Sequence, residues 1–246
     1  MKFRPTPEKL IPDLTPQEEL VILARSLWRE GYNDHLAGHI TINRGDGTLW
    51  CNPWLLTWEE LQPQDVIAID LEGKVVEGNW PAPLGIPLHL ELHRARPDVR
   101  VAVHSHPLFG VVWADLREIP PIMDQSSALG GGGELVLVDE YEGTVDNSNA
   151  AAAAVAKLAD AELALLAGHG VFILGSTVRA VHQRAVALEQ RCQHAWYARA
   201  IANGPLETPL PKSYLDFMEG TDGDGFHGFW ESAVRKELRA DPGLLG

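Results

Sequence analysis

Residues 99–107 have the sequence VRVAVHSHP, in which an apolar run is followed directly by two histidines and a proline. The run from Val99 to Val103 is typical of a buried β-strand. Side chains two residues apart on a strand point to the same face, so His104 and His106 can reach one common point. The stretch therefore predicts a strand that delivers two imidazoles at its end.

A third histidine, His169, lies in the tight turn Gly168-His169-Gly170 between two more predicted strands, 163–166 and 171–174. Glycine on both sides lets the backbone turn sharply and approach whatever the imidazole binds. Three neutral imidazoles suit Zn²⁺, Mn²⁺, Fe²⁺ or Co²⁺ and leave coordination positions open for a substrate. The alternative is that these are separate histidines that hydrogen-bond the backbone at strand ends.

Strand-like and helix-like segments alternate along the whole chain. Thr15, Pro16 and Glu18 form a capping box that begins a helix ending at Gly31. Helices are also expected at 87–96, from 147 or 148 to about 160, after 176 or 177 through 192, and around 229–234, with strands at 39–43, 48–51 and 65–69. This alternation indicates one α/β domain over 15–204, an N-terminal arm over 1–14, and an extension over 205–246 with a helix packing on the domain or a neighbouring subunit.

The composition argues against several classes of protein. The 246 residues include 20 Lys and Arg against 34 Asp and Glu, a net charge of −14, so no basic surface for a nucleic acid is expected. No apolar run reaches the roughly 18 residues of a membrane span, and residues 1–14 lack the apolar block of an export signal, so we expect a cytoplasmic protein. Ten histidines and eight tryptophans indicate a metal or acid–base site and either an aromatic pocket or core anchors.

Four motifs carry a likeness to a known family: GHIT at 38–41, His89 ahead of RPDV at 96–99, AVHSHP at 102–107 and LLAGHG at 165–170. Their order and spacing resemble the class II aldolase/adducin family over about residues 17–200. The resemblance implies a single-domain α/β/α sandwich around a mixed, largely antiparallel sheet, usually assembled as a homotetramer. It also implies that His104, His106 and His169 bind one divalent metal ion per subunit.

Two segments depart from the pattern of the family's phosphosugar aldolases. Those enzymes carry Ser-Ser-Glu, and the epimerases Ser-Asp, shortly before the helix histidine that here is His89; this chain has Pro83, Leu84 and Gly85. Glycine has no side chain to move a proton or bind a metal. The family's phosphate-binding loop is replaced by NPWLL at 52–56, which offers neither hydroxyls nor a compact amide nest. A phosphorylated sugar is therefore not the expected substrate.

Tryptophan is frequent in the segments that build the substrate side of the pocket in relatives, at positions 50, 54, 58 and 80. Trp54 and Trp80 are candidate substrate-binding residues, because an indole stacks on an aromatic ring and excludes water. The alternative is that they are core or interface anchors. Gln125, in the polar stretch 124–127, is either a pocket contact or part of a solvated loop.

His39 and His89 are the candidate catalytic residues, because an imidazole titrates near neutral pH. His39 is alternatively a capping histidine at a strand start. His89, on the predicted helix before the metal strand, is alternatively a hydrogen-bonded core residue. The remaining histidines are expected at the surface: His35, His93, His182, His194 and His227.

These features predict a metal-dependent carbon–carbon lyase acting on a small molecule, with no nucleic-acid or membrane partner. Since some members of the family are decarboxylases, we expect the substrate to be a hydroxylated aromatic or heteroaromatic carboxylate. The alternatives are retro-aldol cleavage of an unphosphorylated hydroxy-carbonyl compound, an Fe(II)-dependent oxygenase, and a non-catalytic module like the adducin head. The presence of all three candidate metal histidines argues against the last.

Overall fold

The computed structural model describes residues 10–129, 134–139, 148–202, 204–219 and 228–246. Within these residues eight strands form one sheet, in the order β4-β3-β2-β1-β5-β8-β7-β6. The strands are β1 (His39–Asn43), β2 (Thr48–Cys51), β3 (Ile67–Asp70), β4 (Val75–Glu77), β5 (Val101–Ser105), β6 (Leu135–Val138), β7 (Leu163–Leu166) and β8 (Gly170–Gly175). Neighbouring strands are antiparallel except β6 and β7, which are parallel, so the sheet is mixed and largely antiparallel, as expected.

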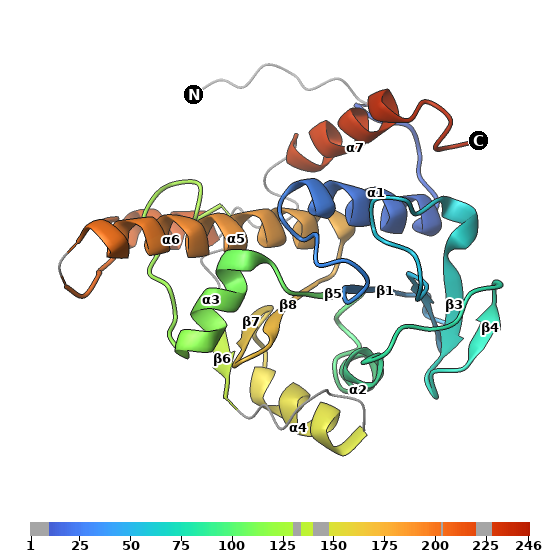
Figure 1. Ribbon diagram of the computed structural model, residues 1–246, viewed down its shortest axis with the longest axis horizontal. Helices are drawn as coiled ribbons and strands as arrows, with labels where there is room; N and C mark the ends of the chain where they lie inside the picture. The colour runs from blue at the N-terminus through green and yellow to red at the C-terminus, as the bar shows by residue number, and fades with distance from the viewer. Residues whose placement is uncertain (1–9, 130–133, 140–147, 203, 220–227) are drawn as a thin grey trace.

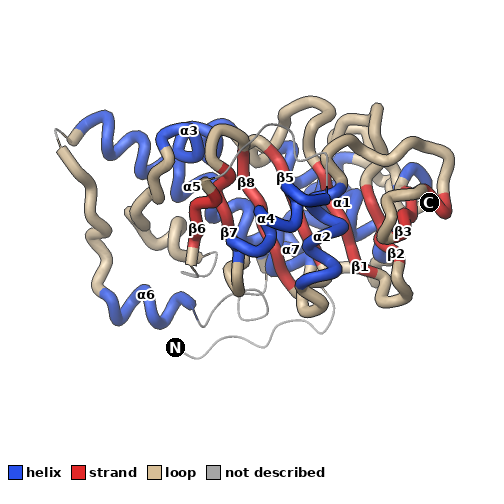
Figure 2. Tube along the Cα trace, turned by 90° about the horizontal axis from the view of Figure 1, so that it is seen from below, coloured by secondary structure: helices blue, strands red, loops and turns tan. Residues whose placement is uncertain are grey.

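Helices cover both faces of this sheet, as Figures 1 and 2 show. The described helices are α1 (Pro16–Arg29), α2 (Pro87–Ala95), α3 (Leu108–Leu116), α4 (Ser148–Leu158), α5 (Val178–Ile201), α6 (Lys212–Glu219) and α7 (Phe229–Ala240), with a 3-10 turn at Pro63–Asp65. Core residues of α1, α3, α5 and α7 pack on one face, and those of α2 and α4 pack on the other. The predicted α/β/α sandwich is confirmed.

The two-residue period of the strands divides side chains between these faces. On β5, Val101 and Val103 belong to the core beneath α1 and α5, whereas Ala102 belongs to the core beneath α2 and α4. His104 follows the same alternation and faces the α2 side. Because β1 is antiparallel to β5, His39 pairs directly opposite His104 in the ladder. The sheet therefore places two of the candidate site residues side by side.

Most element boundaries agree with the sequence prediction to within a few residues, but α5 continues to Ile201, nine residues beyond the expected stretch, and α7 continues to Ala240. The capping box at Thr15 and Glu18 begins α1 as predicted. Strand β5 begins and ends two residues later than expected, so His104 lies inside the strand and His106 just beyond it. Among the described elements, β4, β6, α3 and α6 were not predicted. Residues 1–9 of the predicted arm and the alternative cap at position 147 lie outside the described residues.

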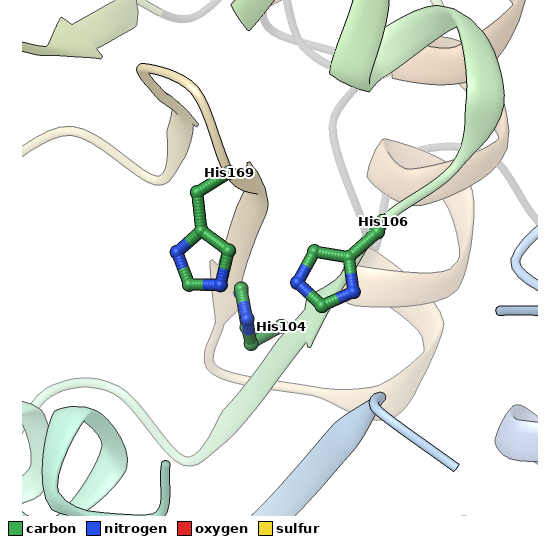
Figure 3. A group of neighbouring side chains, drawn as sticks. All are labelled: His104, His106 and His169. Atoms are coloured by element: carbon green, nitrogen blue, oxygen red, sulfur yellow. The ribbon is translucent and has the colours of Figure 1, made fainter. Parts of the chain in front are cut away.

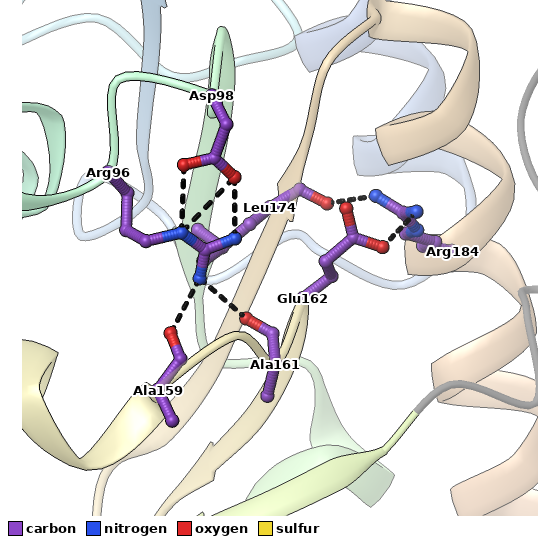
Figure 4. A network of polar contacts seen from close by, with 7 residues as sticks. All are labelled: Arg96, Asp98, Ala159, Ala161, Glu162, Leu174 and Arg184. Atoms are coloured by element: carbon purple, nitrogen blue, oxygen red, sulfur yellow. Dashed lines mark hydrogen bonds and ion pairs between the residues drawn. The ribbon is translucent and has the colours of Figure 1, made fainter.

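Arginine contacts close the end of the sheet opposite to His104 (Figure 4). Arg96, just after α2, donates to the carbonyl oxygen of Ala159 at 2.7 Å and pairs with Asp98 at 2.8 Å. Arg184 of α5 donates to the carbonyl oxygen of Leu174 on β8 and pairs with Glu162. These contacts tie α2, the α4–β7 connection, β8 and α5 together at that end.

Helix α7 packs against α1 and α5 of the same chain. The carboxylate of Glu237 is fully buried, and it accepts from Nε of Arg29 on α1 at 2.6 Å. Arg179 of α5 pairs with Glu231. Within the described part of the chain, no helix combines the length and apolar character needed to cross a membrane.

The prediction that His93 and His182 lie on helix surfaces is wrong: only 5% and 6% of their surfaces are exposed. His93 points from α2 into the layer between helix and sheet, where it contacts Thr41. His182 on α5 is covered by α7, and its ring centroid lies 5.6 Å from that of Trp230. The expectation for His35, an exposed residue, is confirmed, whereas position 227 lies outside the described residues.

Candidate metal centre

His104 is buried at the end of β5, and its Nδ1 lies 2.9 Å from the carbonyl oxygen of Val171 on β8. A carbonyl oxygen only accepts, so Nδ1 carries the ring proton and Nε2 keeps a free lone pair. Burial, followed by repulsion from neighbouring imidazoles, holds the pKa of His104 well below its usual range. A neutral ring with one N–H fixed and one lone pair free is the form that binds a metal.

His106 lies directly after β5 and is held by Asp34. One carboxylate oxygen of Asp34 accepts from the backbone N–H of His106 at 3.0 Å and lies 2.5 Å from its Nδ1. The other ring nitrogen, Nε2, is buried and has no hydrogen-bond partner among the described residues. A carboxylate behind a histidine fixes the ring and makes its second nitrogen more basic. Asp34 was not predicted, because no local motif marks a contact between residues 72 positions apart.

His169 lies in the turn between β7 and β8, and two glycines allow that turn. Gly168 has a φ of +65°, in the left-handed region that favours glycine. A Cβ at Gly170 would lie 2.5 Å from the ring of His106 and 2.5 Å from the carbonyl oxygen of Ser105. The turn therefore approaches His106 more closely than any other residue type at position 170 would allow.

The three rings converge, as Figure 3 shows, from the end of β5, the residue beyond it and the β7–β8 turn. Their centroids lie 4.6–4.9 Å apart, and their candidate ligand atoms all lie within 4.8 Å of one another. Burial, with repulsion from His106, lowers the pKa of His169 to about 4, so this ring is neutral at pH 7. This donor set fits one divalent cation of the Zn²⁺, Mn²⁺, Fe²⁺ or Co²⁺ type. Among the described residues, no carboxylate or thiolate completes the group, which leaves coordination positions for a ligand.

A pocket of about 210 Å³ opens over these rings. It is lined by Ala37, His39, Trp54, Leu84, Gly85, Leu88, His104, His106 and His169. Apart from the histidines, the lining is apolar, and it includes no lysine or arginine. An apolar cavity of about 150 Å³ holds a benzene molecule, so this pocket has room for one substituted ring. Because these lining residues include no lysine or arginine, a bound cation would supply the positive charge for an anionic group on that ring.

His39 and Gly85 form one wall of the pocket. Gly85 has a φ of +75°, and a Cβ built there would lie 2.8 Å from Cε1 of His39. A side chain at position 85 therefore requires His39 to move. Burial, followed by repulsion from His106, lowers the pKa of His39 to about 3. Since its ring centroid lies 5.4 Å from that of His104, a neutral imidazole stands beside the candidate metal site.

The loop carrying Trp54 is fixed to two neighbouring segments. The backbone N–H of Trp54 donates to the carbonyl oxygen of Pro81 at 2.8 Å. The buried side chain of Asn52 accepts from the backbone of Ile40 at 2.7 Å and donates to the carbonyl oxygen of Gly38 at 3.1 Å. The two segments that depart from the phosphosugar pattern therefore lie side by side and build the same wall.

The structure places His39 and Trp54 in one pocket lining with the three converging histidines, and it places three other predicted site residues elsewhere. His89 is fully buried behind His39, with ring centroids 5.8 Å apart. The indole of Trp80 donates to Asp65 at 3.2 Å, outside the lining. Gln125 is exposed in a turn, also outside the lining. The lining residues Ala37, Leu84 and Leu88 carry no sequence signal, because small and aliphatic residues are common everywhere.

Comparisons with known proteins agree with this architecture. Residues 18–196 match the model for the class II aldolase and adducin N-terminal domain. A 5-methylthioribulose-1-phosphate/5-deoxyribulose-1-phosphate aldolase of Rhodospirillum rubrum is 30% identical over 187 residues, which cover 74% of this chain and 81% of that one. A 3,4-dihydroxyphthalate decarboxylase of Arthrobacter keyseri is also 30% identical over 187 residues, which cover 70% and 74%. The crystal structure of an aldolase II superfamily protein of Pseudomonas syringae is 20% identical, with a TM-score of 0.81 and coverage of 95% and 98%.

The family match spans most of the domain, and it includes the strand, the turn and the helix that carry the candidate site. The two relatives, which are equally similar, catalyse different reactions, so the likeness establishes the kind of enzyme rather than its substrate. This chain belongs to the class II aldolase and adducin family, whose aldolases and decarboxylases are lyases and whose class II aldolases use a divalent metal.

Proposed function

We propose that the protein is a divalent-metal-dependent lyase that decarboxylates a hydroxylated aromatic or heteroaromatic carboxylate. The observation that carries the proposal is the apolar wall, built around Gly85 and Trp54, that faces three converging histidines. That wall has no group to bind a phosphate and leaves room for a ring. The relative that decarboxylates 3,4-dihydroxyphthalate supports the same reaction class.

His104, His106 and His169 would hold the ion. When bound, a divalent cation supplies Lewis-acid stabilisation of negative charge on the substrate. The side chains of Trp54, Leu84 and Leu88 bind the ring by excluding water from its faces, and they keep it beside the histidines of the same lining.

His39 moves the proton. Because its pKa is lowered to about 3, the imidazole is neutral at pH 7 and holds a second proton only transiently, so it relays the proton of the substrate hydroxyl rather than keeping it. It then gives that proton to the ring carbon that bears the carboxylate. The carbon–carbon bond breaks, its electron pair returns to the ring, and CO₂ leaves. The product is a phenolate that takes up a proton from water, so no external acid is needed.

The equal similarity to a ribulose-phosphate aldolase favours a second candidate, retro-aldol cleavage. The pocket offers no phosphate-binding group, so the compound cleaved would be an unphosphorylated hydroxy-carbonyl. That reaction requires a base in place of the carboxylate missing at Gly85, and His39 is the one ionisable residue of the lining outside the three candidate ligands.

One experiment separates the candidates. The purified protein is loaded in turn with Zn²⁺, Mn²⁺, Fe²⁺ and Co²⁺, and is then incubated with hydroxybenzoates, hydroxyphthalates and hydroxy-ketones with and without phosphate. Released CO₂, released aldehyde and consumed oxygen are measured together. We expect CO₂ from a hydroxylated ring acid, lost when His104 is changed to Ala. Aldehyde release without CO₂, or consumption of oxygen, contradicts the proposal in favour of the aldolase or the oxygenase.

We further propose a cytoplasmic homo-oligomer, with a tetramer as the expected state. The end of α5 exposes Trp196, Tyr197 and Ile201, to 39%, 50% and 87%, and a second copy would cover these apolar side chains. Light scattering on the purified protein measures the oligomeric state, and a monomer contradicts this part of the proposal.

A further inference from the structure

The buried side chain of Asn52 bonds the chain on both sides of His39. Its Oδ1 accepts from the backbone N–H of Ile40 at 2.7 Å, and its Nδ2 donates to the carbonyl oxygen of Gly38 at 3.1 Å. Asn52, His39 and Ile40 are all buried. One carboxamide therefore bonds both the peptide group before His39 and the peptide group after it.

The backbone sets the direction of these two bonds. A peptide N–H only donates and a peptide carbonyl oxygen only accepts, so Oδ1 of Asn52 faces Ile40 and Nδ2 faces Gly38. In a regular antiparallel ladder Ile40 would donate to the backbone carbonyl of Asn52, whose own N–H does donate to the carbonyl oxygen of Ile40 at 3.3 Å. The side-chain Oδ1 takes the place of that carbonyl where the pairing of β1 and β2 ends.

Trp58 holds one of the same peptide groups from another direction. Its indole Nε1 donates to the carbonyl oxygen of Gly38 at 3.3 Å, and the residue is buried. A Cβ built at Gly38 would lie 2.5 Å from Cζ2 of this indole, so a side chain at position 38 would displace Trp58. The carbonyl group of Gly38 thus has two buried donors, and its peptide group cannot turn without losing both bonds.

Hydrogen bonds anchor His39 through its backbone rather than through Nδ1 of its ring. The rings of His104 and His106 are held at Nδ1 by a carbonyl oxygen and a carboxylate, whereas Nδ1 of His39 is buried with no hydrogen-bond partner among the described residues. Because peptide groups are planar, a residue between two of them can vary only φ and ψ. With both peptide groups bonded to Asn52, φ and ψ of His39 are fixed, and so is the direction in which its side chain leaves β1.

We propose that Asn52 is a positioning residue that holds His39 in place for the proton relay by bonding the peptide groups on both sides of it. The role of His39 in that relay rests on the proposed function, whereas its position follows from the hydrogen bonds. Asn52 also begins the loop that carries Trp54, so one carboxamide joins the histidine and the indole of the same pocket lining.

Crystal structures of the zinc-loaded variants test the position directly. Asn52→Leu keeps the branched shape of the side chain and removes both bonds. We expect the ring of His39 to leave its place, 5.4 Å between centroids from His104, while the three candidate metal ligands stay together. If Asn52→Leu fails to fold, Asn52→Val removes the same bonds with a smaller side chain. A His39 ring that stays in place overturns the proposal.

Kinetics show whether this position matters for the reaction. With a substrate that releases CO₂, Asn52→Leu should lower kcat by about tenfold and leave KM nearly unchanged, because the relay is displaced while the lining that binds the ring remains. Gln183→Leu is the matched control, since it removes another buried carboxamide, which donates to the carbonyl oxygen of Leu129 outside the pocket lining. We expect an unchanged kcat in the control. An unchanged kcat in Asn52→Leu overturns the positioning role.

A double substitution shows whether Asn52 acts through His39. His39→Gln removes the relay, so adding Asn52→Leu to it should lower kcat no further, whereas two independent losses would multiply. Multiplied losses overturn the proposal, because they mean that Asn52 supports the site by another route. If no acid releases CO₂, the proposed function fails, and the crystal structures still decide whether Asn52 positions His39.

Discussion

Two groups of histidines in this protein share the same chemistry and differ in what they face. His104 and His169 lie at strand ends, whereas His93 and His182 lie on helices, and in all four burial is the main cause that lowers the pKa. At the strand ends a ring nitrogen is directed toward the pocket. On the helices the rings face a threonine hydroxyl or an indole. Burial and neutrality therefore do not identify a metal site; what distinguishes the strand-end histidines is that His104 and His169 converge with His106, with ligand atoms within 4.8 Å of one another.

The largest expected effect comes from removing one member of each group. His104→Ala deletes a candidate ligand, so we expect metal content to fall below one equivalent and the proposed activity to fall by roughly 10²–10³-fold. His182→Gln removes an equally buried imidazole from α5 and should leave metal content unchanged. Elemental analysis of the two purified variants, beside the wild type, measures the difference.

Equal metal loss in both variants would contradict the distinction between strand-end and helix histidines, since it would mean that either substitution disrupts the fold. Circular dichroism of each variant separates that case from specific loss of the ion. Full metal content in His104→Ala contradicts its assignment as a ligand.

The next largest effect concerns the carboxylate of Asp34, the partner that distinguishes His106 from the helix histidines His93 and His182. Asp34→Asn keeps an acceptor for the backbone N–H of His106 but removes the negative charge beside Nδ1. Loss of such a partner typically lowers metal affinity by about 10–100-fold. Titration against a chelator of known affinity measures the change. Asp115→Asn, an exposed substitution on α3, is the control. An affinity unchanged by Asp34→Asn would mean that the carboxylate only anchors the loop.

Sequence could predict the strand-end group because its signals are local. His104 and His106 are two residues apart after an apolar run, and glycines flank His169, so each position is marked by its neighbours. The alternation of helices and strands was predictable for the same reason, since α1 has its capping box and β5 its apolar run, whereas the arrangement as an α/β/α sandwich followed from the resemblance to the family. Strand β4 was missed because its three residues give too little periodicity, and β6 was missed although it is as long as β2 and β3.

The helix group could not be predicted, because partners distant in sequence determine its burial. His182 is covered by Trp230, and His93 contacts Thr41, which lies 52 positions away. Asp34 was missed on the same grounds. The role of Gly85 could be predicted only in part. The sequence shows that the carboxylate is missing, but only the fold shows that His39 leaves no room for a side chain at this position.

The next prediction concerns Gly85, which lies against His39 in the lining of the pocket. Gly85→Ala forces a left-handed residue, at a cost of roughly 1–2 kcal/mol, and also places a Cβ 2.8 Å from His39. Gly45→Ala imposes the backbone cost alone, because Gly45 has a φ of +79° and no atom lies within 4 Å of its Cβ position. Urea denaturation should show a similar or larger loss of stability in Gly85→Ala, and the proposed activity should fall in that variant only. Equal activity in both variants means that the His39 contact is not needed.

The smallest effect concerns the pH dependence of stability that the helix group creates. Burial lowers the pKa of His182 to about 4 in the folded protein, whereas an unfolded histidine titrates near 6.5. Between these values the unfolded chain binds the extra proton, so the stability contributed by neutral His182 is complete above pH 6.5 and is lost as the pH falls toward 4. One such group contributes a slope of at most about 1.4 kcal/mol per pH unit. In His182→Gln the slope of the unfolding free energy against pH over this window should be smaller by that amount, as measured by urea denaturation of the metal-free protein.

His35→Asn, which removes an exposed imidazole, is the control for loss of a histidine as such. Identical slopes in the wild type and His182→Gln would mean that His182 takes up its proton without unfolding of the chain. His182 would then titrate as an exposed histidine does, and burial would not hold it neutral.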